Sequence, residues 1–235
     1  MSDEMTIQVN FGKPMAIFPL DSVSLFPQQV LPLHIFEPRY RQMVEHVLDG
    51  SGQFAMAVFQ GERWKQEYHG RPPIRPVVCI GHIVQHQKLP DGRYNILVRG
   101  VCRARIVKEM QGSAQRLYRL ARLEPIGLPF GDDERLYGLR ERLSELLGEG
   151  PLTQLVLGKW VMERVQNDEI PASALLDLTT FALMTDRELK YKLLAEPDAA
   201  VRADLVETEL QKIGRLVEQA ALQHPERWPR GCSWN

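Results

Sequence analysis

The sequence has 235 residues, enough for one large domain or two small ones, and its 44% hydrophobic and 25% charged residues are typical of a globular protein. Its formal net charge of −1 predicts no general affinity for nucleic acids or membranes, and no apolar run approaches the roughly 18 residues of a membrane-spanning helix. The N-terminus has no long apolar run and does not resemble a secretory signal. The chain has three cysteines (Cys79, Cys102 and Cys232), an odd number without C-x-x-C spacing, which does not fit a disulfide-rich secreted protein. We therefore expect a soluble cytoplasmic protein.

The first half of the chain is rich in Val, Ile, Phe and Pro, which favours strands and turns. Prolines 27 and 32 exclude a helix interior over residues 21–32, and no strand is predicted there. Residues 61–76 contain three prolines and are expected to form a loop. The expected elements are a strand over 15–20, a helix starting at Glu37–Pro38 and stopping at Gly50, and strands over 53–59, 77–85, 94–99, 102–106 and 117–123. The apolar face predicted for the helix is Tyr40, Met43, Val44, Val47 and Leu48, at a spacing of three and four residues.

The second half is rich in Leu, Glu, Ala and Arg at helical spacing. The pattern predicts five helices: one capped by Asp132 and Asp133, one over residues 152–166, one from Pro171, one with capping-box spacing between Thr185 and Glu188, and a long one from Asp198. The helix over 152–166 is apolar on nearly all sides, which is typical of the central helix of a bundle.

The two patterns divide the chain. We predict an N-terminal extension (1–13), a β-rich subdomain (14–126), a linker that reads G-L-P-F-G (127–131), a helical subdomain (132–224) and a C-terminal tail (225–235). Basic residues outnumber acidic ones in the β-rich part, and acidic residues outnumber basic ones in the helical part.

Two segments resemble the N-terminal domain of Lon proteases. The first is I-F-P-L-D-S-V-S-L-F-P-Q-Q-V-L-P-L-H-I-F-E-P-R-Y, residues 17–40, and the second is K-L-P-D-G-R-Y-N-I-L-V-R-G-V-C-R-A-R-I, residues 88–106. A weaker likeness covers residues 175–205, so that the resemblance spans most of the chain. It implies an α+β fold, with a PUA-like, closed or strongly curved β subdomain followed by a helical bundle. It also implies a module that recognises unfolded or tagged protein substrates, here without the motor or protease part.

The sequence lacks the common motifs for bond chemistry. Gly12-Lys13 and Gly158-Lys159 lack the following Ser or Thr of a phosphate-binding loop, and there is no G-x-S-x-G or H-E-x-x-H. His82 and His86 on a strand would stand about 13 Å apart, too far for one metal ion. Cys79 and Cys102 are expected to be buried, inert thiols. We therefore predict no catalytic residue, no metal and no cofactor.

The candidate binding residues fall into two groups. An unfolded polypeptide offers apolar segments, so exposed apolar side chains are the expected docking points. The candidate protein-binding residues are Phe26, Leu31, Ile35, Trp64 and Tyr68, with Trp64 expected to be exposed among charges, whereas Leu33 and Phe36 are assigned to the core. The candidate basic face is Arg93, Arg99, Arg103 and Arg105.

The sequence favours a non-catalytic module that binds unfolded or damaged protein, or a specific protein partner, in protein quality control. The alternative is a PUA-like module that binds RNA through the basic face, but few aromatic residues accompany the arginines. No membrane partner is predicted, and the oligomeric state is left open.

Overall fold

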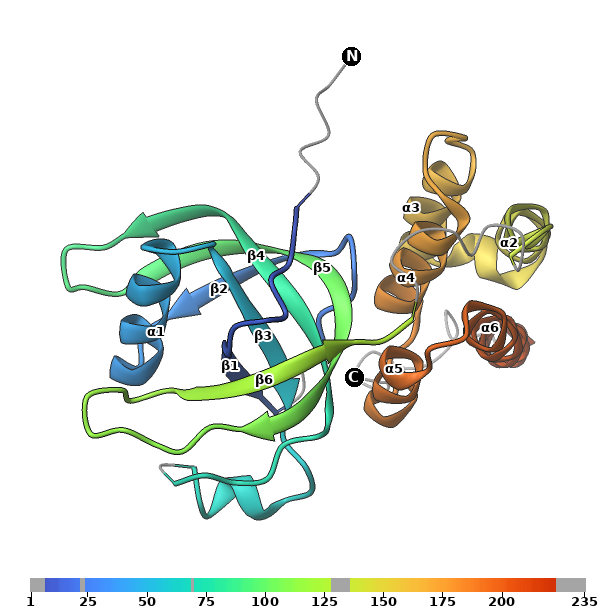
Figure 1. The fold of residues 1–235 in the computed structure, drawn as a ribbon. Coiled ribbons are helices and arrows are strands. Elements are labelled where there is room, and N and C mark those ends of the chain that lie inside the picture. Colours follow the sequence, from blue (N-terminus) through green and yellow to red (C-terminus); the bar gives the residue numbers. More distant parts are fainter. Residues whose placement is uncertain (1–6, 22–23, 69, 128–135, 223–235) are drawn as a thin grey trace. The chain divides into compact units, whose positions relative to one another are not determined.

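The computed structural model describes residues 7–21, 24–68, 70–127 and 136–222 (Figure 1). Its strands are β1 (Met15–Leu20), β2 (Val30–Ile35), β3 (Gln53–Val58), β4 (Val77–Lys88), β5 (Tyr94–Glu109) and β6 (Arg119–Pro125). Its α-helices are α1 (Pro38–Leu48), α2 (Leu139–Gly148), α3 (Val156–Val165), α4 (Ala172–Leu183), α5 (Arg187–Ala195) and α6 (Ala199–Leu222), with short 3₁₀ helices η1 (Arg63–Lys65) and η2 (Pro151–Gln154). The α+β class expected from the sequence is confirmed.

The chain forms two compact units. Unit 1 comprises Met1–Pro129 together with Arg187–Pro197, and unit 2 comprises Phe130–Asp186 together with Asp198–Asn235. The sequence predicted one helical subdomain without interruption from residue 132 to residue 224. In the structure, α5 lies within that range but groups with the strands of unit 1. Of the predicted linker, only Gly127 lies among the described residues, and the predicted caps Asp132 and Asp133 lie outside them.

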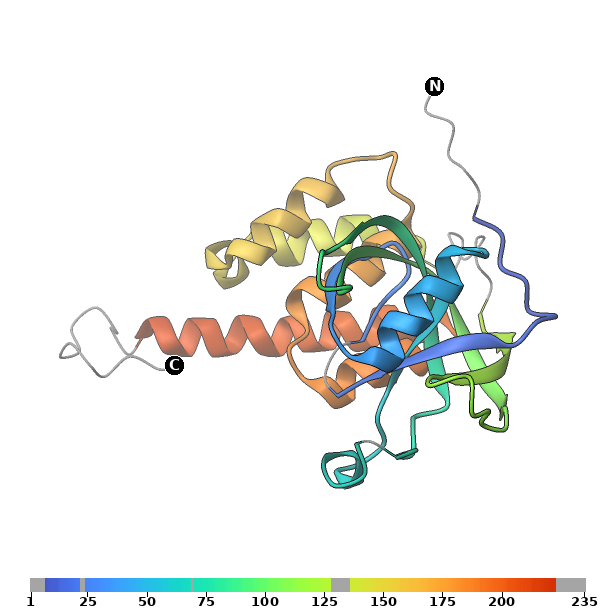
Figure 2. The same cartoon turned by 90° about the vertical axis from the view of Figure 1, so that its left-hand side faces the viewer.

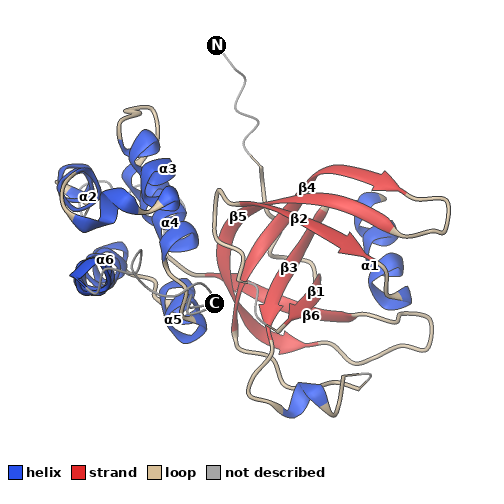
Figure 3. Cartoon of the chain, turned by 180° about the vertical axis from the view of Figure 1, so that it is seen from behind, coloured by secondary structure: helices blue, strands red, loops and turns tan. Residues whose placement is uncertain are grey.

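Strand pairing closes the sheet of unit 1. β1 pairs in parallel with β3 and antiparallel with β6, while β3 pairs with β4 and β4 with β5. β5 is 16 residues long, and its second half pairs with β6, so the order β5-β4-β3-β1-β6 returns to β5 (Figure 3). Among the described strands, β2 stands outside this ring, because it pairs only with the first half of β5.

A pair of facing glycines allows β4 and β5 to bend. Gly81 and Gly100 are register partners at a register shift. A Cβ atom on Gly100 would lie 1.9 Å from the carbonyl oxygen of Phe26, and one on Gly81 would lie 2.5 Å from Cγ1 of Val98. The two strands predicted over 94–99 and 102–106 are therefore one strand, and Gly100 marks a bend in it rather than an end.

The closed sheet is filled by apolar side chains from five strands. Ile17, Ala55, Ile80, Ala104 and Ala121 are all fully buried within it. α1 packs against β1 and β3 and buries Tyr40, Met43, Val44 and Val47, the face that its sequence spacing predicted.

β2 is a strand that the sequence did not predict, because Pro32 lies in its middle. Its register pairs Val30 with Arg99, Pro32 with Leu97 and His34 with Asn95. The Gly100 N–H donates to the Gln29 carbonyl at 2.8 Å, so in the antiparallel alternation the backbone groups of residues 30, 32 and 34 point away from β5. Proline at such a position removes no hydrogen bond of the ladder, which explains why the strand tolerates it.

α5 is tied to unit 1 by side chains on both partners. The backbone N–H of Val77, at the start of β4, donates to the Tyr191 hydroxyl at 2.9 Å. The guanidinium carbon of Arg75 lies 4.4 Å from the centroid of the Tyr191 ring, and Arg75 also pairs with Glu188. These contacts place a helix from the second half of the sequence against the sheet.

Unit 2 is a helical bundle in which α6 is the longest element (Figure 2). Its core includes fully buried Leu143, Leu175, Leu176 and Leu210. The single helix predicted over 152–166 is divided into η2 and α3, and it is not central: Val156 is 81% and Leu157 is 52% exposed. Only one side of α3, formed by Gly158, Val161 and Val165, is buried.

Candidate functional site

Two of the apolar side chains predicted to dock protein are in the core. Phe26 is 0% and Ile35 is 2% exposed, so neither can meet a partner on the surface. Phe26 is drawn inward because its backbone packs on Gly100, and Ile35 is the inward-facing last residue of β2. Leu31 is half-buried. The prediction that Phe26 and Ile35 line an exposed site is therefore corrected.

Two aromatic residues that follow β3, Trp64 and Tyr68, pack on the closed sheet of unit 1, which we call the barrel. Trp64 stacks on buried Phe59 with ring centroids 5.5 Å apart and planes 7° apart, and Tyr68 lies edge-on to both rings. The Tyr68 hydroxyl also donates to Glu37. Trp64 was expected to be exposed, but it is half-buried, because stacking on Phe59 covers one face of the indole. The pair anchors the loop at residues 61–76.

The most exposed apolar side chains of this region are ones that the sequence did not select. Phe36 was assigned to the core but is 60% exposed, and Val30 is 50% exposed. The ring of Phe36 is stacked on His34, with centroids 6.2 Å apart. The strand alternation explains this result: inward-facing Leu31, Leu33 and Ile35 take the buried side, and the next residue outward is Phe36.

The four predicted arginines do not form one face. Arg103 is 7% exposed, so its side chain is not on a solvated basic surface, and this part of the prediction is corrected. β5 bends at Gly100, and its second half, which carries Arg103 and Arg105, pairs with both β4 and β6. Arg105 is exposed on that second half, whereas Arg93 and Arg99 lie beside β2.

Arg93 and Arg99 are therefore neighbours of the exposed apolar residues. Arg99 is opposite Val30 in the register and donates to the Gln28 side chain at 2.5 and 3.2 Å, a neutral partner that leaves its charge uncompensated. Arg93 contacts His34 at 3.4 Å but is paired with Asp91 at 2.5 Å. The hydrogen bond from Arg93 holds the pKa of Asp91 below its ordinary value.

We name this surface the β2 face. It consists of the outward residues of β2 and of the first half of β5, together with Phe36, which directly follows β2: Val30, Pro32, His34, Phe36, Leu97 and Arg99. The backbone groups along its outer edge point away from β5, so an extended polypeptide can pair with them. Because Pro32 offers a carbonyl but no N–H, this edge can donate only from residues 30 and 34, which limits uncontrolled pairing with other strands.

The turn that begins β2 is fixed by Gln28. This residue has φ of 65°, while the Gln29 N–H donates to the Phe26 carbonyl at 3.2 Å and the Gln28 N–H donates to the Gly100 carbonyl at 2.9 Å. The Gln29 side chain closes the turn by accepting from the Phe26 N–H at 2.9 Å. The F-P-Q-Q segment is thus a turn followed by a bulge that sets the register of the β2 face.

Within the described residues, no cluster of three or more His, Cys, Asp or Glu suited to a metal ion occurs. Burial raises the pKa of the Cys102 thiol to about 11, which keeps it protonated and unreactive at neutral pH. In the described part of the chain, no helix has both the length and the apolar character needed to cross a bilayer.

Comparison with known proteins now identifies the fold and its family. Residues 14–212 match the family model described as the ATP-dependent protease La (LON) substrate-binding domain. The chain belongs to this family. The match covers the strands that carry the β2 face and the helices of unit 2 as far as residue 212 in α6, and it confirms the resemblance seen in the sequence.

Individual relatives agree with the family match. A Lon protease of Desulfovibrio desulfuricans is 29% identical over 89% of this chain, and Lon protease 2 of Syntrophobacter fumaroxidans is 32% identical over 36% of it. The chain spans only 23% and 10% of those two proteins. The similarity therefore concerns the substrate-binding domain and leaves the rest of those proteins unmatched.

Two solved structures share the fold. The N-terminal domain of a Mycobacterium avium complex Lon protease superposes with a TM-score of 0.64 over 85% of this chain and 98% of its own, at 18% identity. A Lon N-terminal domain protein from Xanthomonas campestris superposes with a TM-score of 0.58 over 82% of this chain and 95% of its own, also at 18% identity.

Proposed function

We propose that this chain is a non-catalytic module that binds segments of unfolded or damaged protein, or a protein partner, through the β2 face, as an adaptor in cytoplasmic protein quality control. The observation that carries the proposal is the position of Phe36, a 60% exposed phenylalanine next to the open edge of β2. The family match supports protein substrates as the ligand class.

The mechanism follows from the two kinds of group on this face. An extended segment of a client polypeptide lies alongside β2 and exchanges backbone hydrogen bonds with residues 30, 32 and 34. Its apolar side chains cover Phe36 and Val30, which removes apolar surface from water. Backbone pairing does not depend on side-chain identity, so such a face accepts many sequences, as a binder of non-native protein must.

A direct test is the binding of a permanently unfolded, reduced and alkylated protein. The Phe36→Ala variant is expected to bind it about tenfold more weakly, because it loses most of one exposed phenylalanine's contact area. The matched control is Val107→Ala, since Val107 is also 60% exposed but lies on the second half of β5, away from β2. Equal affinities for the two variants would remove the β2 face from the mechanism.

The RNA-binding alternative requires a continuous basic surface. Arg103 is buried and Arg93 is paired with Asp91, so of the four predicted arginines only Arg99 and Arg105 remain exposed without a carboxylate partner that the structure describes. A protein client and RNA also differ in salt dependence, because phosphate contacts release counterions. Binding to unfolded protein that persists in moderate salt, with no salt-sensitive shift of RNA, is the result expected here.

A further inference from the structure

A small cleft in unit 1 shares no residue with the β2 face. It has a volume of about 140 Å³ and is enclosed by β1, by the start of α1, by residues 70–72 and by residues 112–118 between β5 and β6. This volume is well below the roughly 300–1,000 Å³ of sites that hold drug-sized molecules. Whatever occupies the cleft is therefore a small group, such as the end of a longer molecule.

The polar lining of this cleft is strongly basic. Four arginines line it, Arg39, Arg71, Arg116 and Arg119, and no aspartate or glutamate is among its lining residues. Such a lining attracts a negatively charged group, provided that the arginines are not all neutralised by carboxylates behind them.

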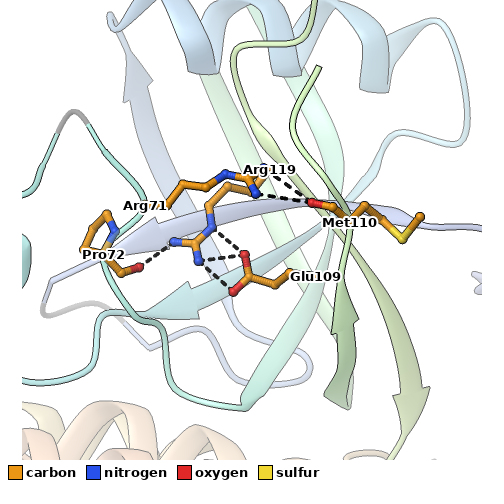
Figure 4. A network of polar contacts seen from close by, with 5 residues as sticks. All are labelled: Arg71, Pro72, Glu109, Met110 and Arg119. Carbon is orange, nitrogen blue, oxygen red and sulfur yellow. Dashed lines mark hydrogen bonds and ion pairs between the residues drawn. The ribbon is translucent and has the colours of Figure 1, made fainter. Parts of the chain in front are cut away.

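Two of the four arginines are neutralised. Arg119 forms a bidentate ion pair with Glu109, with nitrogen–oxygen distances of 2.7 to 2.9 Å, and it also donates to the Pro72 carbonyl at 2.7 Å (Figure 4). Arg39 pairs with Glu37 at 3.0 Å. These two guanidinium groups are held in place and keep little capacity for a further charge.

The other two arginines contact only neutral groups among the described residues. Both Nη atoms of Arg71 lie at 3.4 Å from the Met110 carbonyl, which is a long and weak contact (Figure 4). Arg116 donates from Nη2 to the Gln111 carbonyl at 3.1 Å, and its Nε is buried without a hydrogen-bond partner in the described part of the chain. A buried N–H without an acceptor is destabilising, so the Arg116 guanidinium has hydrogen-bonding capacity that its described neighbours do not use.

The segments that carry these arginines are fixed in advance. Gln42 of α1 donates to the Gln115 carbonyl at 2.9 Å and accepts from the Leu117 N–H at 2.8 Å, which fixes the chain on both sides of Arg116. The Arg119–Pro72 hydrogen bond fixes the chain beside Arg71. A site whose charged groups are already positioned loses less entropy when its ligand binds.

Apolar groups share the cleft with the arginines. Leu117, whose side chain is 57% exposed, is among its lining residues, together with the buried residues Ile17, Pro19 and Phe59. A free phosphate has no apolar part that could contact Leu117, whereas the last residue of a polypeptide carries a carboxylate and a side chain on the same carbon. We propose that this cleft binds the C-terminal carboxylate and last side chain of a client or partner polypeptide. The inference rests on the proposed function and specifies which part of the client is held.

The test uses two pools of octapeptides randomised at their last four positions, one with free C-terminal carboxylates and one with C-terminal amides. Each pool is passed over the immobilised full chain, and the retained peptides are quantified by mass spectrometry. The carboxylate pool is expected to be retained at least about tenfold more strongly, since a charge-assisted hydrogen bond is lost in the amide. Equal retention of the two pools would overturn the inference.

Substitutions locate the effect. Arg71→Gln and Arg116→Gln are each expected to lower retention of the carboxylate pool towards that of the amide pool, without changing the amide pool. Arg122→Gln is the control, because Arg122 is an exposed arginine of β6 that does not line the cleft. Arg71 is exposed, so its variant remains informative if the Arg116 variant does not fold.

Competitors distinguish the ligand class. N-acetyl-leucine is expected to displace the carboxylate pool, and N-acetyl-leucinamide is not. Displacement by inorganic phosphate at lower concentrations than N-acetyl-leucine would show a phosphate site and overturn the inference. If the unsubstituted protein shows no preference for the carboxylate pool but still binds unfolded protein in a Phe36-dependent way, this inference alone is overturned. If it prefers the carboxylate pool but Phe36→Ala does not weaken its binding of unfolded protein, only the role of the β2 face is overturned.

Discussion

Substitution of Gly100 by alanine tests the closure of the barrel most directly. The added Cβ would lie 1.9 Å from the Phe26 carbonyl oxygen and 2.7 Å from its carbonyl carbon, so the backbone of residues 26–29 must move. The two hydrogen bonds between Gly100 and the Gln28–Gln29 segment, at 2.9 and 2.8 Å, are then weakened or lost. Gly100 has no left-handed φ, so the penalty arises from the close approach of two backbones rather than from conformational preference.

The magnitude can be worked from these contacts. Two backbone hydrogen bonds contribute about 1 kcal/mol each, and forced overpacking adds about 1–3 kcal/mol, which gives a loss of roughly 3–5 kcal/mol in the free energy of unfolding. With a urea slope of about 2 kcal/mol per molar, the midpoint of unit 1 falls by roughly 1.5–2.5 M. A loss of this size is a large part of the stability of a typical domain.

The assay is hydrogen exchange by mass spectrometry at increasing urea concentrations, read on peptides from β3 and β4 for unit 1 and from α4 for unit 2. The control is Gly61→Ala, because Gly61 has φ of 65° but no atom within 4 Å of the position of a Cβ, so only the conformational cost of about 1–2 kcal/mol applies. If Gly100→Ala destabilises unit 1 no more than Gly61→Ala does, the packing of Phe26 on Gly100 does not hold the barrel closed.

Two further outcomes follow from the structure. Tyr191→Phe is expected to destabilise unit 1 by about 1–2 kcal/mol, because the Val77 N–H loses its acceptor. The α5 amides should then be less protected in hydrogen exchange. Unchanged protection would mean that the Tyr191 hydroxyl does not anchor α5. The rate of alkylation of the Cys102 thiol in the folded protein is expected to stay low at pH 8 to 9 and to rise as the pH approaches the thiol pKa of about 11, because the thiolate is the nucleophile. In urea-unfolded protein the thiol has its ordinary pKa near 9, so it should react faster across that range. Rapid alkylation of the folded protein at pH 8 would contradict burial of the thiol.

Local pattern predicted most of the elements but not their joining. The spacing of Tyr40, Met43, Val44 and Val47 predicted α1 and its buried face, because a helical period is visible within a dozen residues. β2 was missed because proline is normally excluded from strands, and only the position of Pro32 relative to a strand distant in sequence makes it acceptable. Likewise, Gly100 read as the end of a strand, since nothing local shows that Phe26 packs against it.

The candidate site shows the same division. The resemblance identified the family, and the F-P-Q-Q and L-P-D-G segments do border the β2 face. Which side chains of that region are exposed was not predicted: Phe36 was assigned to the core, and Phe26 and Ile35 to the surface. In an irregular segment, the same types of apolar residue occur at buried and at exposed positions, so the residue type does not predict which side chains are buried.

The sequence by itself determined the α+β class, the family and the amphipathic face of α1, because each depends on short-range periodicity or on a run of matching residues. The tertiary structure decided three things: that the strands close into a ring, that α5 packs on this closed sheet, and that Arg71, Arg116 and Leu117 line one cleft. Each of these depends on contacts between residues far apart in the chain, where register, bend and burial are set by packing rather than by neighbouring residues.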